Sequence, residues 1–523
     1  MAVRILHEKE IKFKMLAGVT LLSDIVAPTL GPGEKSALVR QESGIALISS
    51  SGTEAASSLI LQDSFENIGV QVIKKAASTV KEQAGDGSAT TIVLADHILK
   101  RSLSNIASGA NPVELRRGIQ AAAQLGCAAI KKISKPFQPQ EDIHKMIALS
   151  GLDPSIGGII AEAFDKVGDS GIIKVEESPE LEPSVTTAEG MHYEKGYTSS
   201  QFLSEKQSLT EELKEPFILV TDQEISNPYD LIPVLEAVSR TGRPLLIIAD
   251  HVTDAVLSLL IVNKKNGKIN SVVAHPPAYG DGRKEQLEDI SIYSGGTFLS
   301  AQLGYSVKNA TLDMLGSAQK VLIDAHRTVI LNGKSDSGRL KQHISGLRAQ
   351  YANTDYAFQK GRIAERLAKL QTGAAVIYAG ASTETEMKGQ KILIENTVNT
   401  VKSAWKGGVV PGGGVVYLDI QKPIRAYANT LSGDLKTGAE ILISALQAPI
   451  RQIALNSGAS GEVVVSKLET FPRGYGYNVI TGEYLNMFQT GIIDSAEAAY
   501  LALQCASSAA SMLITTEAGI IRI

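Results

Sequence analysis

The sequence is poor in cysteine, and its charges nearly cancel. Only Cys127 and Cys505 occur among 523 residues, and neither lies beside a second cysteine or a histidine at ligand spacing, which argues against a disulfide framework or a zinc site. The 51 Lys and Arg residues nearly balance the 55 Asp and Glu residues, for a net charge of -4. Such a chain has no general attraction for nucleic acid or for an anionic membrane. We therefore expect neither among its partners.

Long hydrophobic runs are also missing. No stretch reaches the roughly 18 apolar residues of a membrane span. The opening MAVRILHEKEIKFKML carries a charge every few positions instead of the apolar core of a signal peptide. The expected location is therefore the cytoplasm. No GxxxxGK[ST] motif follows a strand pattern either, which disfavours a P-loop ATPase.

What the chain does contain is enough apolar sequence for several domains. The 44% apolar and 20% charged composition is that of a folded globular protein. Residues 8–134 are predicted to be mostly helical, because apolar residues recur at helical spacing. From about 190 to 372, short β-branched runs alternate with amphipathic segments, which predicts a separate α/β domain. The rest is again helical, so we expect one discontinuous helical domain with the α/β domain inserted in it.

Three glycine-rich turns lie in the two halves of that helical domain. In QAGDGSATTIVLADHIL (83–99), Asp86 lies between two glycines at a helix start. Bare glycines let backbone N–H groups approach phosphate oxygens, and a carboxylate can hold the magnesium ion that screens them. The other turns are Thr29–Gly33 and Gly412–Gly414. A Gly-Asp-Gly sequence is also a common ordinary turn, but three such turns together favour one phosphate pocket.

At this point the chain resembles the GroEL-type bacterial chaperonins. The resemblance extends in order and spacing over nearly the whole sequence. It is carried by these segments: TLGP (29–32), FENIGVQVIKKAAS (65–78), AGDGSATTIVLA (84–95), NPVELRRGI (111–119), PVLEAV (233–238), PLLIIA (244–249), GGVVPGGG (407–414), YGYN (475–478) and SMLITTEA (511–518).

The resemblance implies a multidomain α and α/β fold in three parts. An equatorial ATP-binding domain would take residues 1–132 and 407–523. A hinged intermediate domain would take 133–188 and 373–406, and an apical peptide-binding domain 189–372. The family binds unfolded or non-native polypeptides, assembles as homo-oligomeric rings of seven subunits and is capped by a GroES-like co-chaperonin.

The resemblance also implies a binding site for ATP and Mg²⁺. Thr29, Leu30, Gly31 and Pro32 would wrap the phosphates, and Asp86 would hold the magnesium ion. Gly413 would face the sugar, and Asp494 the ribose hydroxyls. The remaining matching positions are Ser50, Gly87, Ser88, Ala89 and Thr90 near the phosphates, and Asn478, Val479 and Ile480 near the adenine.

Two departures from the family concern hydrolysis. The family uses two further aspartates to activate the attacking water, and the matching positions here are Ser51 and Asn396. A hydroxyl or an amide can hydrogen-bond a water but cannot take its proton, and base catalysis is worth about 10²–10⁴-fold. We therefore expect ATP binding with slow or absent hydrolysis. The alternative is that Glu395, about 100° around the helix, or another carboxylate compensates.

The family's apolar peptide-binding face also has matching positions in the α/β segment. Without the resemblance, several of these residues would simply be predicted as core. One of them, Gln201, is polar where the family has a tyrosine. The positions are Tyr197, Gln201, Phe202, Ile232, Leu235, Leu257, Ile261 and Val262.

Three functions remain open from the sequence. The first is an ATP-driven folding chaperone, and the second is a binding or assembly protein that keeps the chaperonin architecture without its cycle. A small-molecule phosphotransferase finds no supporting histidine or lysine cluster. Contacts between rings also look altered, because Ser460 stands where an acidic partner for Arg451 is expected, so a single or weakly paired ring fits the sequence.

Overall fold

The computed structural model describes residues 3–32, 37–40, 46–49, 56, 59–168, 172–178, 180–204, 209–278, 280–354, 356–371 and 373–522. The chain divides into two compact units. Unit 1 is made of residues 1–161, 175–184 and 378–523, and unit 2 of residues 162–174 and 185–377. Unit 2 is thus inserted in unit 1, as the helical, α/β, helical pattern predicts. A separate intermediate domain stays a prediction.

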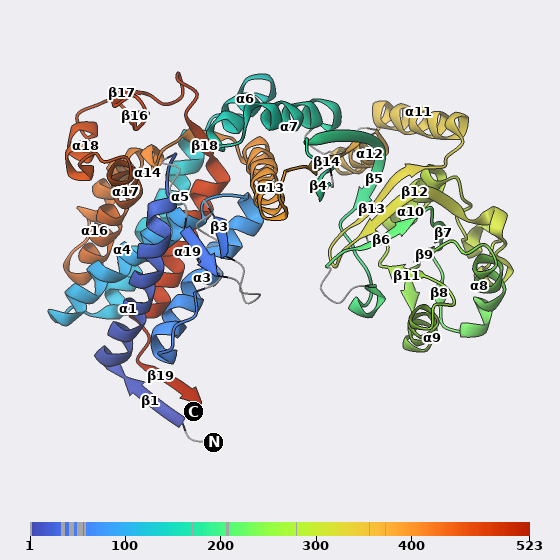
Figure 1. Ribbon diagram of the computed structural model, residues 1–523, viewed down its shortest axis with the longest axis horizontal. Coiled ribbons are helices and arrows are strands. Elements are labelled where there is room, and N and C mark those ends of the chain that lie inside the picture. Colours follow the sequence, from blue (N-terminus) through green and yellow to red (C-terminus); the bar gives the residue numbers. More distant parts are fainter. Residues whose placement is uncertain are drawn as a thin grey trace. The chain divides into compact units, whose positions relative to one another are not determined.

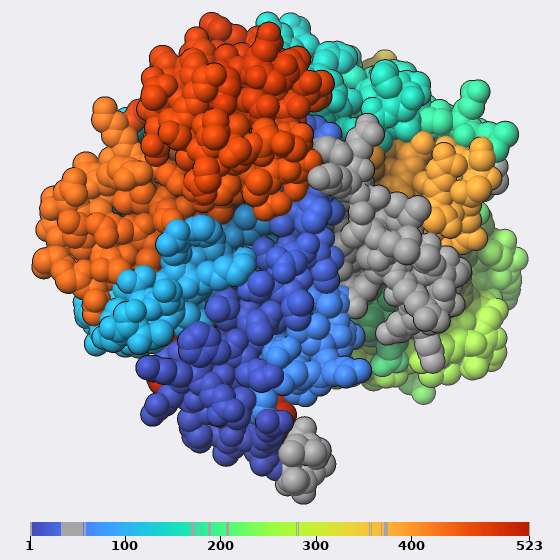
Figure 2. All heavy atoms as spheres, turned by 60° about the vertical axis from the view of Figure 1, so that its left-hand side comes forward, coloured from blue at the N-terminus to red at the C-terminus, as the bar shows by residue number. Residues whose placement is uncertain are grey.

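Unit 1 is built on long helices from both ends of the sequence. Their apolar faces share one core, which includes Leu22, Ile73, Ile98, Ile119, Leu442 and Leu503. In Figure 2 the blue N-terminal and the orange and red C-terminal segments of this unit lie side by side on one face. The helices are α1 (Glu8–Val26), α3 (Ser64–Ala84), α4 (Ser88–Ala107), α5 (Pro112–Ile133), α16 (Gly433–Ala445) and α19 (Ala496–Ile514).

The two ends of unit 1 are joined by a two-stranded antiparallel ribbon. Strand β1 (Val3–His7) pairs with β19 (Ala518–Arg522), and Figure 1 shows both termini at this ribbon. Buried Lys12 adds an ion pair to Glu517 at 2.6 Å. The packing of first and last segments thus makes one domain from sequence that the insertion of unit 2 separates.

Shorter elements of unit 1 surround this bundle. Helix α13 (Glu384–Gly407) packs on α3, α6 and α19, and its Trp405 contacts Phe137 with ring centroids 5.3 Å apart. The remaining helices include α6 (Pro139–Leu149), α14 (Val415–Asp419), α15 (Gln421–Ala428), α17 (Ala448–Asn456) and α18 (Gly461–Leu468). The strand pairs are β2 (Ala37–Arg40) with β3 (Ala46–Ser49), β15 (Val409–Pro411) with β18 (Ile493–Ser495), and β16 (Tyr475–Asn478) with β17 (Glu483–Asn486).

Unit 2 is an α/β domain on a mixed sheet, in agreement with the alternating pattern of its sequence. The strands β11, β9 and β7 are parallel to one another, with β11 and β9 fully buried, and β12 and β13 follow them antiparallel. The strands in sheet order are β11 (Ser271–Ala274), β9 (Leu245–Ile248), β7 (Phe217–Val220), β12 (Gly316–Ile323), β13 (Thr328–Gly333), β5 (Ser184–Tyr193), β14 (Gly373–Ala379) and β4 (Ile172–Glu177), with β6 (Glu211–Lys214) also paired to β12. Each of β5, β14 and β4 contains a boundary between the units.

Helices pack on this sheet and on one another. They are α8 (Ile232–Ser239), α9 (Asp254–Lys265), α10 (Asp281–Ser294), α11 (Ser337–Asn353) and α12 (Ala357–Gln371). Helix α7 (Pro154–Val167) contains one of the boundaries between the units. None of the helices in the described part of the chain combines the length and the apolar character that a membrane span requires.

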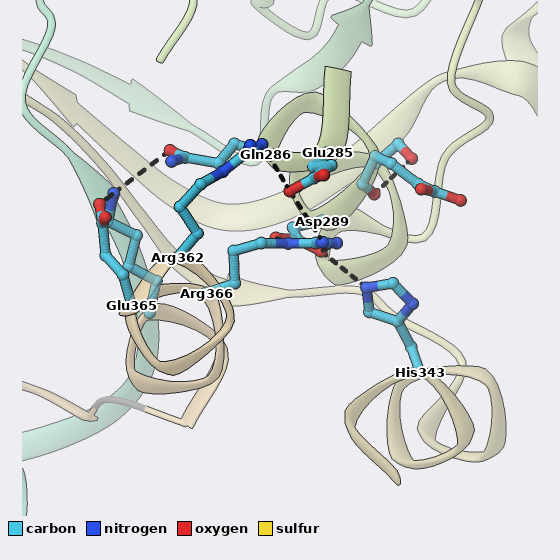
Figure 3. Close-up of polar contacts among 10 residues, drawn as sticks. Glu285, Gln286, Asp289, His343, Arg362, Glu365 and Arg366 are labelled. Atoms are coloured by element: carbon cyan, nitrogen blue, oxygen red, sulfur yellow. Dashed lines mark hydrogen bonds and ion pairs between the residues drawn. The ribbon is translucent and has the colours of Figure 1, made fainter. Parts of the chain in front are cut away.

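A buried polar cluster ties α10, α11 and α12 together (Figure 3). The Arg366 guanidinium donates from Nε and Nη2 to the two carboxylate oxygens of Asp289, both at 2.7 Å. His343 from α11 approaches the same carboxylate, with Nε2 at 2.6 Å from Oδ1. The side chains of Asp289 and Arg366 are only 1% and 7% exposed. The bidentate ion pair thus joins α10 to α12, in addition to the apolar contacts that Leu347 and Leu370 make with the core of unit 2.

Candidate functional site

The Asp86 turn connects two long helices of unit 1. Gly85 ends α3 with φ +77°, and Gly87 precedes α4 with φ +94°, so both take a left-handed conformation that favours glycine. Asp86 lies exposed between them, and the Gly87 N–H donates to its Oδ1 at 2.6 Å. No side chain caps the start of α4. Backbone N–H groups at this helix start are therefore suited to an anion, with a carboxylate directly beside them.

The residues that follow Asp86 are held by the same turn. Thr91 donates from its hydroxyl to the Gly87 carbonyl at 2.8 Å. Ser88 is buried at the first position of α4, and Ala89 and Thr90 are half-buried. Three consecutive residues of the predicted site, Ser88–Thr90, thus belong to the first turn of one helix, and Gly87 precedes them. The first backbone N–H groups of an α-helix point out of the helix start and do not take part in its i to i−4 hydrogen-bond pattern.

The second predicted turn packs against α4. A 3₁₀ turn, η1 (Ala27–Thr29), ends α1, and Leu30 packs with Val93 of α4. The Asn456 amide of α17 donates to the carbonyls of Ala27 and Leu30, both at 2.8 Å. Gly31 has φ +90° and lies against Ile453 of the same helix, and Pro32 follows it exposed. The TLGP segment is thus fixed in a defined loop at the side of α4.

The third turn and Asp494 come together with Asp86. Asp494 pairs with Val410 across the β15–β18 ladder, and it accepts a hydrogen bond from the Gly413 backbone N–H. Burial, followed by the negative charge of Asp86, raises the pKa of Asp494 to about 7. The same two carboxylates, after burial itself, raise the pKa of the Tyr417 phenol. Two turns that are far apart in sequence therefore meet around a pair of acidic side chains.

The adenine-side residues lie on a ribbon next to Gly413. Strand β16 ends at Asn478, whose Oδ1 accepts from the Ile480 N–H at 2.9 Å and so closes the turn to β17. The side chain of Ile480 is 80% exposed, and Val479 is half-buried. Met487 lies between the ribbon and the Gly413 loop. A Cβ added to Gly476 of β16 and a Cβ added to Gly413 would both contact the Met487 side chain. The Gly413 loop and the Asn478 ribbon are thus neighbours.

Helix α13 closes the other side of the Asp86 turn. A Cβ on Gly85 would lie 2.6 Å from both the Asn399 Cβ and the Thr400 backbone nitrogen. Asn396 is half-buried about one turn earlier, and its carbonyl accepts from the Thr400 hydroxyl at 2.8 Å. This brings Asn396 near the turn, as its predicted role requires.

Glu395, the alternative base, has a different set of neighbours. Burial raises its pKa, while the charges of Lys391 and Lys81 act to lower it. Lys81 lies on α3, four residues before Gly85. The net effect is a raised pKa, which makes the Glu395 carboxylate a stronger proton acceptor than an ordinary glutamate.

Ser50 and Ser51 fall outside the described residues. The backbone of β3, which ends at Ser49, contacts α13. The described chain therefore leads toward the helix that carries Asn396 just before these two serines.

The candidate cation position depends on one exposed carboxylate and its neighbour. Within the described residues, no set of three or more His, Cys, Asp or Glu side chains is arranged for a metal ion. Asp86 and Asp494 nevertheless repel each other electrostatically. Mg²⁺ is commonly held by one or two carboxylates together with water and substrate phosphates. The residues present fit an ion that arrives with a nucleotide.

The predicted peptide-binding residues of unit 2 differ in exposure. Ile232 and Val262 are 37% and 53% exposed, and Gln201 is also exposed. Tyr197 and Leu257 are half-buried. The others pack in the core of unit 2: Phe202, Leu235 and Ile261.

Several residues around the site carry no motif in the sequence. Tyr417 donates to the Ala499 carbonyl at 3.1 Å, and Asp419, with a pKa raised by burial to about 6, accepts from the Gly474 N–H at 3.0 Å. Asn456 makes one hydrogen bond to the backbone of the TLGP loop, at Leu30, and one to Ala27 just before it. The only sequence signal for the first two is their position just after the triple glycine.

Comparisons with known proteins agree with this architecture. The family model of the TCP-1/cpn60 chaperonins matches residues 22–522. The chain is also similar to the solved structure of the chaperonin gp146 from the bacteriophage EL 2 (Pseudomonas aeruginosa), with 18% identity over 99% of both chains. The TM-score is 0.72 for its crystal form II and 0.67 for form I, both in the presence of ATP-BeFx. At this identity the likeness establishes the fold.

Proposed function

Because the chain belongs to the TCP-1/cpn60 chaperonin family, we propose that it is a chaperonin subunit that binds non-native polypeptides and ATP with Mg²⁺ but hydrolyses ATP slowly or not at all. The observation that carries the nucleotide site is the meeting of the Asp86 turn, the Gly413 loop and Asp494 beside α13. The phage chaperonin of the same fold was crystallised in the presence of an ATP analogue.

Each wall of the site has a plain chemical use in nucleotide binding. The backbone N–H groups at the start of α4 and the TLGP loop would receive phosphate oxygens. Asp86 would hold Mg²⁺, which screens the phosphate charge. Asp494, which holds a proton up to about pH 7, could both donate and accept a hydrogen bond at a ribose hydroxyl. Exposed Ile480 and the Asn478 turn offer an apolar surface and an amide to a base.

Slow hydrolysis follows from the groups at the two water-activating positions. Asn396 and Ser51 carry no carboxylate, and loss of a general base costs about 10²–10⁴-fold in rate. Burial raises the pKa of Glu395, but its side chain points about 100° around α13 from Asn396, which opposes its use as a substitute base. The chain would thus hold ATP for long periods as a bound ligand.

The test is steady-state phosphate release by the natural chain and by the double variant Ser51→Asp, Asn396→Asp. We expect the double variant to be at least about 100-fold faster. Gln390→Glu adds a carboxylate to the same helix about 120° away from Asn396 and should leave the rate unchanged. Equal rates in the natural chain and the double variant would contradict the loss of turnover.

Ring assembly is supported by the ribbon of unit 1. Strands β1 and β19 form a two-stranded sheet in which Ile5 and Ile520 are paired and are 47% and 64% exposed. Exposed apolar side chains on a ribbon with free edges suit contact with another subunit. A homo-oligomeric ring of seven subunits in the cytoplasm, with a GroES-like co-chaperonin, is the family expectation, and light scattering would measure its mass.

Pairing of two rings is less favoured. Arg451 donates from Nη2 to its own chain's Glu462 at 3.0 Å. A guanidinium engaged within the subunit has less to offer a second ring. A single ring would have half the mass of a double ring in the same light-scattering measurement.

The second candidate is a binding or assembly protein without a folding cycle. The replacements at Ser51 and Asn396 favour it, because a cycle needs hydrolysis to reset the nucleotide state. The two candidates differ in refolding of a denatured enzyme with ATP. An increased yield supports a cycling chaperone, whereas capture of the denatured enzyme without release supports the binding protein.

A further inference from the structure

The predicted peptide-binding residues come from separate elements of unit 2. The 3₁₀ turn η2 (Ser200–Phe202) carries Gln201 and Phe202, and helix α9 carries Leu257, Ile261 and Val262. Turn η2 contacts both α9 and β11. Phe202 and Ile261 lie in the same core, whereas Gln201 and Val262 are exposed. The distance between η2 and α9 therefore decides how far apart these two exposed side chains lie.

A buried carboxylate ties the two elements together. Glu211 accepts from the Ser204 backbone N–H at 2.6 Å through Oε2, and from the Ser204 hydroxyl at 2.5 Å through Oε1. The Lys264 ammonium donates to the same Oε1 at 2.6 Å. The side chains of Lys264 and Glu211 are 9% and 4% exposed. One carboxylate thus holds two donors from the end of the η2 segment and one from the end of α9.

The tie is anchored to the sheet. Glu211 is the first residue of β6 and pairs with Ile323 of the central strand β12. Ser204 lies two residues after η2, and Lys264 is the next-to-last residue of α9. The segment after η2 and the end of helix α9 are therefore both bonded to Glu211, a residue of the sheet strand β6.

Such a cluster is better suited to fixing geometry than to stabilising the fold. Removing two charges from water costs about as much as their attraction returns, and burial indeed lowers the pKa of Lys264 against the opposing effect of Glu211. Hydrogen bonds to an ionised group are nevertheless short and directional. The main effect of the hydrogen bonds to Glu211 is therefore to fix the position of Ser204 and of the chain before it.

We propose that Glu211 is a positioning residue, which with Lys264 and Ser204 holds the η2 segment at a set distance from the end of α9 and so sets the affinity for non-native polypeptide. The proposal rests on the proposed function of unit 2 as the peptide-binding domain. It adds a polar group that touches no client to the apolar positions that the sequence predicts.

The test is the double variant Glu211→Leu, Lys264→Met. It replaces the ion pair by apolar side chains of similar size, a change that buried pairs often tolerate, and it removes both bonds to Ser204. We expect an unchanged unfolding midpoint and amide exchange of residues 199–204 about tenfold faster or more. The affinity for reduced, carboxymethylated α-lactalbumin, a permanently unfolded probe, should fall about tenfold.

Three further variants complete the design. Lys264→Arg keeps a cationic donor and should retain the natural affinity and exchange rates. Lys265→Met removes a neighbouring exposed charge of α9 and should change neither the affinity for the unfolded probe nor the exchange rates. Ser204→Ala removes one of the three hydrogen bonds to Glu211 while both charges stay paired. It should accelerate the amide exchange of residues 199–204 by a smaller factor, and it keeps the proposal testable even if the double variant fails to fold.

The outcomes separate the two proposals. Unchanged exchange at residues 199–204 overturns the positioning role, and faster exchange with unchanged affinity overturns its role in binding. A natural chain that does not bind the unfolded probe contradicts the proposed function instead, because exchange reports the position of η2 independently of binding.

Discussion

Gly85 and Thr400 lie in direct backbone contact, because a Cβ on Gly85 would be 2.6 Å from the Thr400 backbone nitrogen. A segment from the N-terminal part of unit 1 and one from its C-terminal part thus meet at the turn that carries Asp86. The contact brings α13, and with it Asn396, to the candidate nucleotide site. It needs a residue that has no side chain and that tolerates φ +77°.

Gly85→Ala should therefore destabilise unit 1. We expect the free energy of unfolding to fall by about 2–4 kcal/mol, from strain at a left-handed position and from overpacking against α13. Urea unfolding followed by the fluorescence of Trp405, which lies on α13, measures this. Gly109→Ala is the matched control, since Gly109 has φ +104° with nothing within 4 Å. It should cost only the strain, about 1–2 kcal/mol, and equal losses would contradict the contact.

Stability should depend on pH through Asp494. Its pKa in the folded chain is about 7 and its ordinary value is 3.8, so the folded state holds the extra proton between these values. The free energy of unfolding should thus fall as pH rises from about 4 to about 7, by roughly 2–4 kcal/mol, and stay level above. Asp494→Asn should remove most of this slope. Asp419, whose pKa is about 6, would leave a smaller slope in the lower part of the range.

Asp86→Asn should abolish the gain in ATP affinity that Mg²⁺ provides, because the amide does not balance the charge of the ion. Titration calorimetry of ATP with Mg²⁺ and with EDTA compares the two states. Glu82→Gln removes an exposed carboxylate one turn earlier and should keep the full effect of Mg²⁺. Asp86→Asn should also lower the pKa of Asp494, since the charge of Asp86 raises that pKa. An unaltered effect of Mg²⁺ in Asp86→Asn would remove Asp86 from the metal site.

Breaking the Asp289–Arg366 pair of Figure 3 should strongly destabilise unit 2. Asp289→Leu removes the bidentate carboxylate of the buried Arg366 guanidinium and leaves it only the 3.2 Å contact with the more exposed Glu285, at a cost of about 3–5 kcal/mol. Asp289→Leu combined with Arg366→Met should recover most of the loss, because no buried charge remains unpaired. Urea unfolding of the three chains gives the comparison. Glu285, which is 39% exposed, is the control, and Glu285→Gln should cost less than about 1 kcal/mol.

Local patterns in the sequence predicted the elements well. The helical spacing predicted for residues 8–134 is confirmed in α3, where Phe65, Ile73 and Val80 are buried. The short β-branched runs predicted from about 190 to 372 include the neighbouring strands β7 and β9. The resemblance to the GroEL-type chaperonins is confirmed by the family match. These features depend on neighbouring residues, or on motifs that are themselves short and continuous.

The sequence by itself determined the elements, the inserted order of the two units and the family of this chain, because periodicity and turn chemistry act over a few residues. Only the tertiary structure decided which distant groups meet. Asp494 comes near Asp86 through the β15–β18 ladder, and Glu211 meets Lys264 through the packing of β6 and α9. Such pairs leave no periodic trace in a single sequence, since their approach depends on how separate elements bury their apolar faces against one another.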